Sequence, residues 1–159
     1  MTISRRTMTA MVGAALGSLA LIPLAGTHAE AQAAKLVDVN MAAAADLQQL
    51  PNMTPAIAQA IVAKRPYKTV VDLNKVLVDQ KLTPAQARDF YRKAFIPINL
   101  NTGTKDQFLL IPGVGPRMSG EFEEYRPWKS WVQFDKEIGK YVGQAETDRL
   151  KMYFFIPGV

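Results

Sequence analysis

The chain contains no cysteine, and its single histidine, His28, lies near the N-terminus. The rest of the sequence therefore has no common zinc ligand set and no Cys or Ser-His nucleophile pair. Beyond residue 31 the serines are Ser119 and Ser130, and neither lies in a nucleophile-elbow sequence. We expect no enzymatic activity, no metal and no cofactor. Because no disulfide is available, stability must come from a packed core, which a 48% hydrophobic composition can supply.

Residues 1–31 have the three parts of a secretory signal peptide. Arg5 and Arg6 form the positive end, Met11–Ala25 is a short apolar stretch, and two sites of the A-x-A type follow. We predict cleavage near Ala31 to Ala34 and a periplasmic or secreted product, with Sec and twin-arginine export both open. The apolar stretch is shorter than the roughly 20 residues that span a bilayer. No later stretch is longer, so we expect no membrane span after signal removal.

The remainder is an internal repeat in which residues realign at an offset of 61. Matched residues include an asparagine, two prolines and an Arg-Pro-aromatic-Lys-hydroxyl block, and the offset falls to 60 at the last matched segment. The matches are Asn40 with Asn101, Pro51 with Pro112, Pro55 with Pro116, 65–69 with 126–130, and 95–97 with 155–157. We place the first copy at 35–97 and the second at 98–159. The joint at Pro97–Asn99 is too short and apolar for a flexible linker, so we expect one compact body.

Each copy is predicted to form four short helices, which makes the fold class all-α. Thr83-Pro84 and the Thr104–Gln107 capping box are two of the start signals. The expected helices of the first copy occupy 42–50, 55–65, a short stretch capped by Thr69 that holds Val70, Leu73 and Val76, and 84–94. Those of the second occupy 104–111, 116–125, a stretch capped by Ser130 that holds Trp131 and Phe134, and 144–154. Only Val37–Val39 and Ile98–Leu100 look extended, and they are too short to define a sheet.

A glycine turn in the second copy, Ile111-Pro-Gly-Val-Gly-Pro116, resembles the helix-hairpin-helix motif. With Ile98-Asn-Leu-Asn-Thr102 before it and Tyr125-Arg-Pro-Trp-Lys-Ser130 after it, the frame resembles the ComEA family of exported competence DNA receptors. The first copy has the same frame, from Val37-Asp-Val-Asn40 to Arg65-Pro-Tyr-Lys-Thr69. The resemblance covers nearly all of the chain beyond the signal. It implies a tandem helix-hairpin-helix fold that binds double-stranded DNA.

In such a hairpin the glycines allow a sharp turn, because glycine adopts positive φ without a Cβ clash. The apolar residue between them is expected to point into the core. Backbone N–H groups then face outward at the N-terminus of the second helix, where they favour an anion. The resemblance implies that this anion is a DNA phosphate, held without reading sequence. The implied phosphate site comprises Gly113, Val114, Gly115 and Arg117 in the second copy, and Asn52, Met53 and Thr54 in the first.

The first copy departs from the motif because Asn52 and Thr54 stand where glycines are expected. Asparagine tolerates the left-handed region fairly well, whereas a β-branched threonine does not. We therefore expect a distorted hairpin in the first copy. Thr54 could instead serve as an N-cap ahead of Pro55.

Two basic clusters are further candidates for phosphate contact. Lys64, Arg65 and Lys68 could grip phosphate in the first copy, although an arginine before proline in both copies could equally cap a helix end. Arg88, Arg92 and Lys93 could form a second basic surface, but we favour an ordinary solvated helix face. The remaining repeated residues are interpreted as structural: Tyr67, Trp128 and Trp131 as core or turn anchors, and Asn40 and Asn101 as turn residues or caps.

The intact glycine hairpin and the excess of positive charge lie in different copies. Residues 32–96 carry nine Lys and Arg against five Asp and Glu, whereas residues 97–159 carry eight of each. The copy with the intact glycine turn is therefore neutral, and it contains Glu121, Glu123 and Glu124. A DNA-binding surface would ideally combine both features, because counterion release supplies most non-specific affinity.

Two functions of different class remain open. The first is an exported, non-sequence-specific DNA-binding protein of ComEA type. An accessory factor of an exported nuclease or other DNA enzyme is a further possibility, which the sequence does not separate from the first. The alternative is a periplasmic protein-interaction module that has kept the fold and lost DNA binding. The extrinsic PsbU family of photosystem II uses a similar fold in this way, and the segment Pro66–Asp72 is similar to it.

Overall fold

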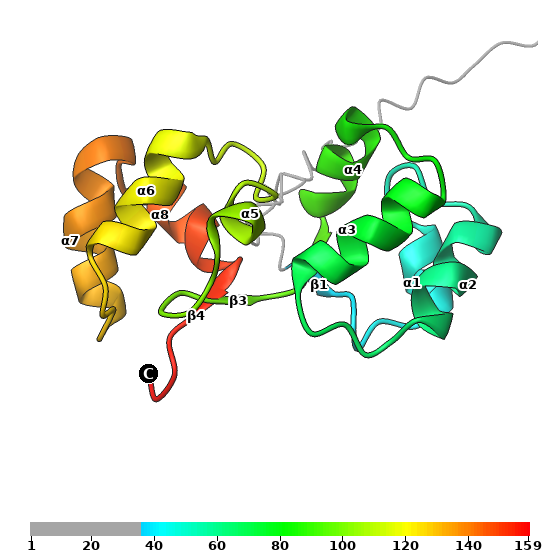
Figure 1. The fold of residues 1–159 in the computed structure, drawn as a ribbon, viewed down its shortest axis with the longest axis horizontal. Helices are drawn as coiled ribbons and strands as arrows, with labels where there is room; N and C mark the ends of the chain where they lie inside the picture. The colour runs from blue at the N-terminus through cyan, green and yellow to red at the C-terminus, as the bar shows by residue number, and fades with distance from the viewer. Residues whose placement is uncertain (1–35) are drawn as a thin grey trace, which may run out of the picture. The chain divides into compact units, whose positions relative to one another are not determined.

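The computed structural model describes residues 36–159. The predicted signal peptide, its cleavage site and His28 lie outside the described residues. The all-α prediction is confirmed: the described chain is a mostly helical, compact body with eight helices in two groups, and its strands have only two residues each (Figure 1).

The first group of helices belongs to the first copy and begins at the predicted signals. Thr54, Thr69 and Thr83 each act as an N-cap, because their side chains accept the N–H of the third helical residue. Pro55 and Pro84 occupy the first helical position, where their missing N–H costs nothing. The helices are α1 (Ala44–Gln48), α2 (Pro55–Ala63), α3 (Val70–Asp79) and α4 (Pro84–Tyr91).

The second group repeats this arrangement with one difference at its end. Thr104 and Ser130 cap their helices as predicted. The last two helices are separated only by Gly143, which has φ 78° and ends one helix while it starts the next. This is where the repeat loses one residue. The helices are α5 (Lys105–Phe108), α6 (Pro116–Glu124), α7 (Trp131–Val142) and α8 (Gln144–Lys151).

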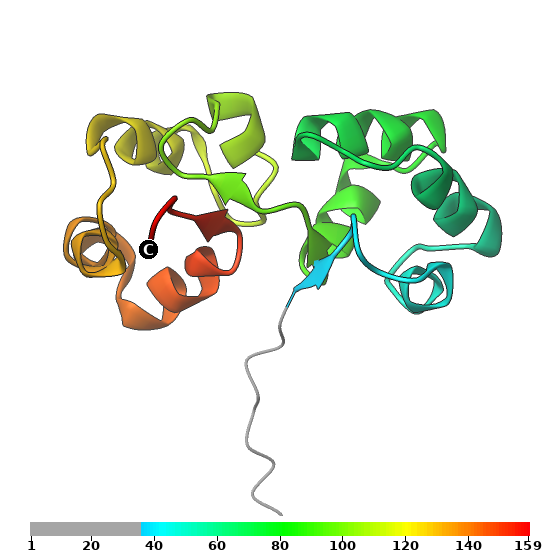
Figure 2. The ribbon, with the colours of Figure 1, turned by 90° about the horizontal axis from the view of Figure 1, so that it is seen from below.

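Two short parallel strand pairs correct the prediction at the end of each copy. β1 (Val37–Asp38) pairs with β2 (Ala94–Phe95), and β3 (Ile98–Asn99) pairs with β4 (Phe154–Phe155), as Figure 2 shows. The predicted last helix of each copy was therefore too long, because its final residues pair with the start of the same copy. Periodicity alone does not reveal this, since a two-residue strand has no pattern of its own.

The core of each copy is continuous with that of the other. In the second copy the rings of Phe108, Phe122 and Phe154 meet edge to face. Tyr153 connects the copies, because its ring lies 4.8 Å from that of Phe95 and its hydroxyl donates to the Tyr91 carbonyl oxygen at 3.2 Å. These contacts are buried, and they fix the end of α4 against the second copy.

A membrane-spanning helix is not found between residues 36 and 159, where every helix is too short or too polar for that role.

Candidate nucleic-acid interface

The two hairpins have the same backbone conformation despite their different sequences. Asn52 and Gly113 both lie in the left-handed region, with φ 62° and 87°. The residues two positions later, Thr54 and Gly115, are both extended, with φ −113° and −105°. The predicted distortion of the first hairpin is therefore wrong. Only the first glycine position of the turn needs positive φ, and asparagine is one of the few other residues that adopt it.

The apolar residue at the centre of each turn points inward, as predicted. Val114 is buried, and Met53 is half-buried against the same core. Each closes its turn by donating its N–H to the carbonyl oxygen three residues earlier, Met53 to Leu50 at 3.3 Å and Val114 to Ile111 at 3.0 Å. The central residues are thus anchors of the turn, and their side chains are turned away from any ligand.

The two hairpins differ in the N–H groups that they leave open. The Thr54 hydroxyl accepts the N–H of Ile57 at 3.3 Å, which occupies one donor of the first turn of α2. Gly115 provides no such cap for α6. Because Pro116 has no N–H, the donors without an intrahelical partner in the first turn of α6 are those of Arg117 and Met118. The second hairpin therefore presents one more open donor to an anion than the first.

Cationic side chains flank the start of α6. Arg117 is exposed, and its guanidinium lies 5.8 Å from the centre of the Tyr141 ring on α7. Lys140 donates to the Tyr125 hydroxyl oxygen at 2.7 Å, and this bond, followed by its bond to Glu137, raises the pKa of Lys140. Lys140 is therefore cationic at neutral pH.

These groups line a cavity of about 450 Å³ next to the second hairpin; its walls are Gly115, Arg117, Met118, Glu121, Lys140, Tyr141 and Val142. The hydrogen bond with Tyr125, together with desolvation and Glu121, raises the pKa of Tyr141 to about 12. Tyr141 is thus neutral at physiological pH and adds no negative charge to the cavity.

The acidic residues of α6 lie mostly at its other end. Glu123 and Glu124 are exposed in its last turn, about 10 Å along the helix axis from the open N–H of Arg117 at a rise of about 1.5 Å per residue. That separation is close to the Debye length of about 8 Å at physiological salt. Their repulsion of an anion at the hairpin is therefore largely screened.

A second pair of side chains holds the other side of this hairpin. Arg149 on α8 donates to the carbonyl oxygen of Pro112 at 2.8 Å and pairs with Glu146 at 2.6 Å. Its Nη2 lies 3.4 Å from the point that a Cβ on Gly113 would occupy. Arg149 therefore braces the loop, and its charge is already paired with a carboxylate.

The arginine that precedes proline in each copy is structural. Arg65 donates to the Ala42 carbonyl oxygen at 2.7 Å, and Arg126 donates to the carbonyl oxygens of Leu100 and Gly103. Both arginines reach back to the segment that enters the hairpin of their own copy. Of the three basic residues predicted to grip phosphate in the first copy, Arg65 is thus turned to the backbone, and Lys64 and Lys68 are exposed.

Lys64 and Lys68 do not form one surface with the first hairpin. Lys64 makes an exposed ion pair with Asp79 on α3 at 3.5 Å, and Lys68 lines a separate cavity with Pro97 and Asn99. Such an exposed pair is weak, so Lys64 remains available to another anion.

The repeated asparagines join the segment before each hairpin to the segment that follows its second helix. The amide of Asn101 accepts the Trp128 N–H at 2.6 Å and donates to the Trp128 carbonyl oxygen at 2.9 Å. Asn40 makes the same two bonds to Tyr67 in the first copy. Tyr67 and Trp128 are buried, so their predicted role as anchors is confirmed, and no base can stack on them.

Comparison with known proteins gives one match. A family model described as the helix-hairpin-helix motif, the motif found in ComEA-like proteins, matches residues 32–92. The comparisons with curated proteins and with solved structures gave no match. The matched segment is the first copy, whose turn lacks both glycines. This agrees with the backbone conformation, which is the same in both hairpins. The motif suggests non-specific DNA binding.

Proposed function

We propose that this chain is an exported protein that binds double-stranded DNA without sequence preference, with the second hairpin as its main phosphate site. The observation that carries the proposal is the uncapped start of α6, where the N–H groups of Arg117 and Met118 are open and the Arg117 side chain is exposed beside them. An anion there is favoured by the donors, the helix dipole and the guanidinium together. The proposal assigns no catalytic residue.

The sequence-independent character follows from the groups involved. Backbone N–H groups and arginines contact phosphate oxygens, which are the same at every base pair. Binding supplied by such contacts depends on counterion release, so the affinity should fall steeply as salt rises between about 50 and 200 mM. The resemblance to ComEA proteins extends this proposal to a role in DNA uptake.

The test is fluorescence anisotropy with a short duplex over a salt series, using wild type and Gly115→Thr. Gly115 has the same extended conformation as Thr54, and nothing lies within 4 Å of a Cβ there, so threonine should fit and cap α6. The new hydroxyl would occupy the Met118 N–H. We expect weaker binding with unchanged or slightly raised stability.

A matched control is Thr54→Gly, which opens the corresponding donor in the first hairpin. It should leave duplex affinity unchanged or raise it, although the loss of the cap costs stability. Absence of binding by the wild type even at low salt would exclude this function.

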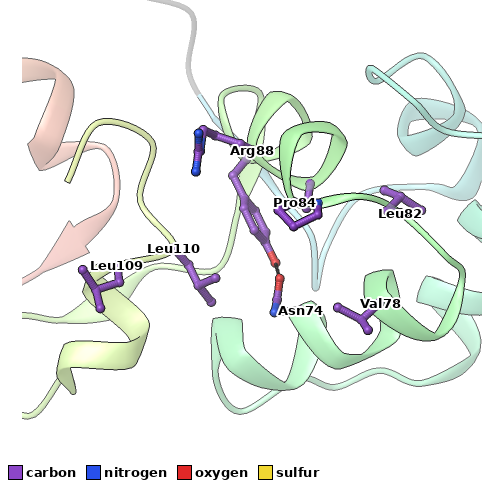
Figure 3. A pocket seen from close by; sticks show the side chains of 9 residues that line it. Asn74, Val78, Leu82, Pro84, Arg88, Leu109 and Leu110 are labelled. Atoms are coloured by element: carbon purple, nitrogen blue, oxygen red, sulfur yellow. Dashed lines mark hydrogen bonds between the residues drawn. The ribbon is translucent and has the colours of Figure 1, made fainter. Parts of the chain in front are cut away.

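A second candidate function is docking on a protein partner in the periplasm. It is favoured by a cavity of about 300 Å³ with apolar walls, at whose rim Val78 and Leu109 are exposed (Figure 3). Such exposed apolar side chains around a hollow are typical of protein contacts. A double variant, Val78→Ser/Leu109→Ser, should abolish partner capture from periplasmic extract and leave duplex binding intact.

We propose export from the sequence of residues 1–31. Mass spectrometry of the protein recovered from the periplasm should give a new N-terminus between residues 32 and 35, whereas an intact Met1 would contradict export by this signal.

A further inference from the structure

The second copy has no net positive charge, but the first copy brings two arginines close to the second hairpin where the copies meet. Arg92, at the end of α4, lines a cavity of about 420 Å³ together with Pro112 and Gly113 of the second hairpin. Arg88, four residues earlier on α4, lines the neighbouring cavity together with Leu109 and Leu110, which lead into that hairpin (Figure 3).

The spacing of these arginines matches the course of the hairpin. Residues four apart on a helix are neighbours on one face. Arg88 and Arg92 therefore lie one helical turn apart, beside successive parts of segment 109–113 in the second copy. The sequence interpretation of α4 as an ordinary solvated face does not account for this placement.

Buried contacts hold α4 in this position. Tyr91, between the two arginines, is buried. Its carbonyl oxygen accepts a hydrogen bond from the Tyr153 hydroxyl, and its own hydroxyl donates to the Asn74 side-chain oxygen at 2.9 Å. Phe95, just after α4, stacks edge to face on Tyr153. The two arginines are thus carried on a backbone that is fixed relative to the second hairpin.

Both guanidinium groups are available to an anion. Within residues 36–159, Arg88 forms no ion pair. Arg92 pairs with Asp89 at 3.1 Å, but both side chains are at least half exposed, and exposed pairs of this kind are weak. A phosphate can therefore replace the aspartate as the partner of Arg92.

We propose that a DNA strand bound at the second hairpin continues across the junction onto α4 of the first copy, where Arg88 and Arg92 contact its neighbouring phosphates. This inference rests on the proposed function. It makes the two copies one binding surface, in which the second supplies the open backbone donors and Arg117, and the first adds two further cations. The glycine hairpin and the basic residues, which the sequence places in different copies, therefore lie on one surface in the folded chain.

The test compares duplex binding by Arg88→Gln/Arg92→Gln with that of Lys129→Gln/Lys136→Gln, using the whole chain over a salt series. The control removes the same charge from exposed lysines of the second copy that line neither cavity. For the arginine variant we expect affinity lower by roughly tenfold at low salt, and a salt slope reduced by about two, one for each lost phosphate contact. The control should change both quantities much less.

A second pair of variants tests the same contact by a change that should strengthen duplex binding instead of weakening it. Asp89→Asn releases Arg92 and should tighten duplex binding, whereas Asp79→Asn makes the same charge change at the Lys64 pair and should have a smaller effect. Equal affinities and slopes for the two double variants would overturn the inference and leave the DNA function standing, provided that Gly115→Thr still weakens binding. A wild type that binds no duplex would overturn both.

Discussion

Asn52 and Gly113 occupy the same place in the two hairpins and share the left-handed backbone conformation, whereas their neighbours Thr54 and Gly115 do not need it. The hairpin therefore depends on one residue with positive φ and not on two glycines. Once this is recognised, the Asn-Met-Thr turn of the first copy is a complete hairpin, and its difference from the second copy lies in the N-cap.

The two glycines of the second hairpin should respond differently to alanine. Gly113→Ala forces a Cβ into the left-handed region and toward Arg149, and we expect a loss of about 1–2 kcal/mol in the free energy of unfolding. Gly115→Ala meets no atom within 4 Å and keeps an ordinary φ, so it should change stability by less than about 0.5 kcal/mol or raise it slightly. Urea denaturation followed by circular dichroism measures both. Equal losses would show that both positions need glycine.

The threonine cap of α2 should have a measurable effect on stability. Thr54→Ala removes the acceptor of the Ile57 N–H, and we expect a loss of about 1 kcal/mol. Thr54→Ser retains the hydroxyl and should be close to wild type in the same denaturation experiment. A serine variant as unstable as the alanine variant would mean that the methyl group, and not the cap, is what matters.

The fold was predictable where each signal is local. Caps such as Thr83 and Thr104, first-turn prolines and the repeat itself place the helices within a few residues. The strand pairs were not predictable. Phe154–Phe155 is extended only because it pairs with Ile98–Asn99, which lies 56 positions earlier in the chain. Tertiary hydrogen bonds of this kind leave no trace in periodicity.

The candidate site was predictable only in part, for a similar reason. Gly113, Gly115 and Arg117 follow from the motif, but Arg149 was missed because its contact with Pro112 spans 37 positions. Arg92 was seen as basic and could not be assigned to the second hairpin from sequence. Arg65 was predicted to contact phosphate because a surface arginine and an arginine bonded to the backbone cannot be told apart in sequence. The matching arginine in the second copy, Arg126, did indicate a structural role.

Arg126 should matter for folding and not directly for DNA. Its guanidinium donates to two backbone carbonyl oxygens and lies 5.5 Å from the centre of the Phe108 ring. Lysine keeps the charge but cannot reproduce the forked geometry, so Arg126→Lys should lose roughly 1–3 kcal/mol of stability. Duplex affinity of the folded variant should equal that of wild type in anisotropy. Lower affinity at unchanged stability would place Arg126 in the DNA contact instead.

The asparagine that closes each unit gives a matched pair of variants. Asn101→Ala leaves the Trp128 N–H and carbonyl oxygen without their partner, and Asn40→Ala does the same at Tyr67. Each should cost about 1–3 kcal/mol, because an unpaired buried polar group is not compensated by water. Similar losses would show that the two copies use the same closure. A negligible effect at either position would mean that water replaces the amide there.

The junction between the copies should make them unfold together. Tyr153 contributes a buried hydroxyl bond to Tyr91 and an edge-to-face contact with Phe95, so it couples the core of one copy to that of the other. Tyr153→Phe removes only the hydroxyl and should cost about 1 kcal/mol while a single transition is kept. Tyr153→Ala removes the ring as well, with an expected cost of about 3–5 kcal/mol, and should separate the transitions of the two copies. Thermal unfolding followed by calorimetry and by tryptophan fluorescence distinguishes these outcomes, because Trp128 and Trp131 both report on the second copy. If the two probes already disagree in the wild type, the copies are independent, and the surface shared by α4 and the second hairpin is not held rigid by this contact.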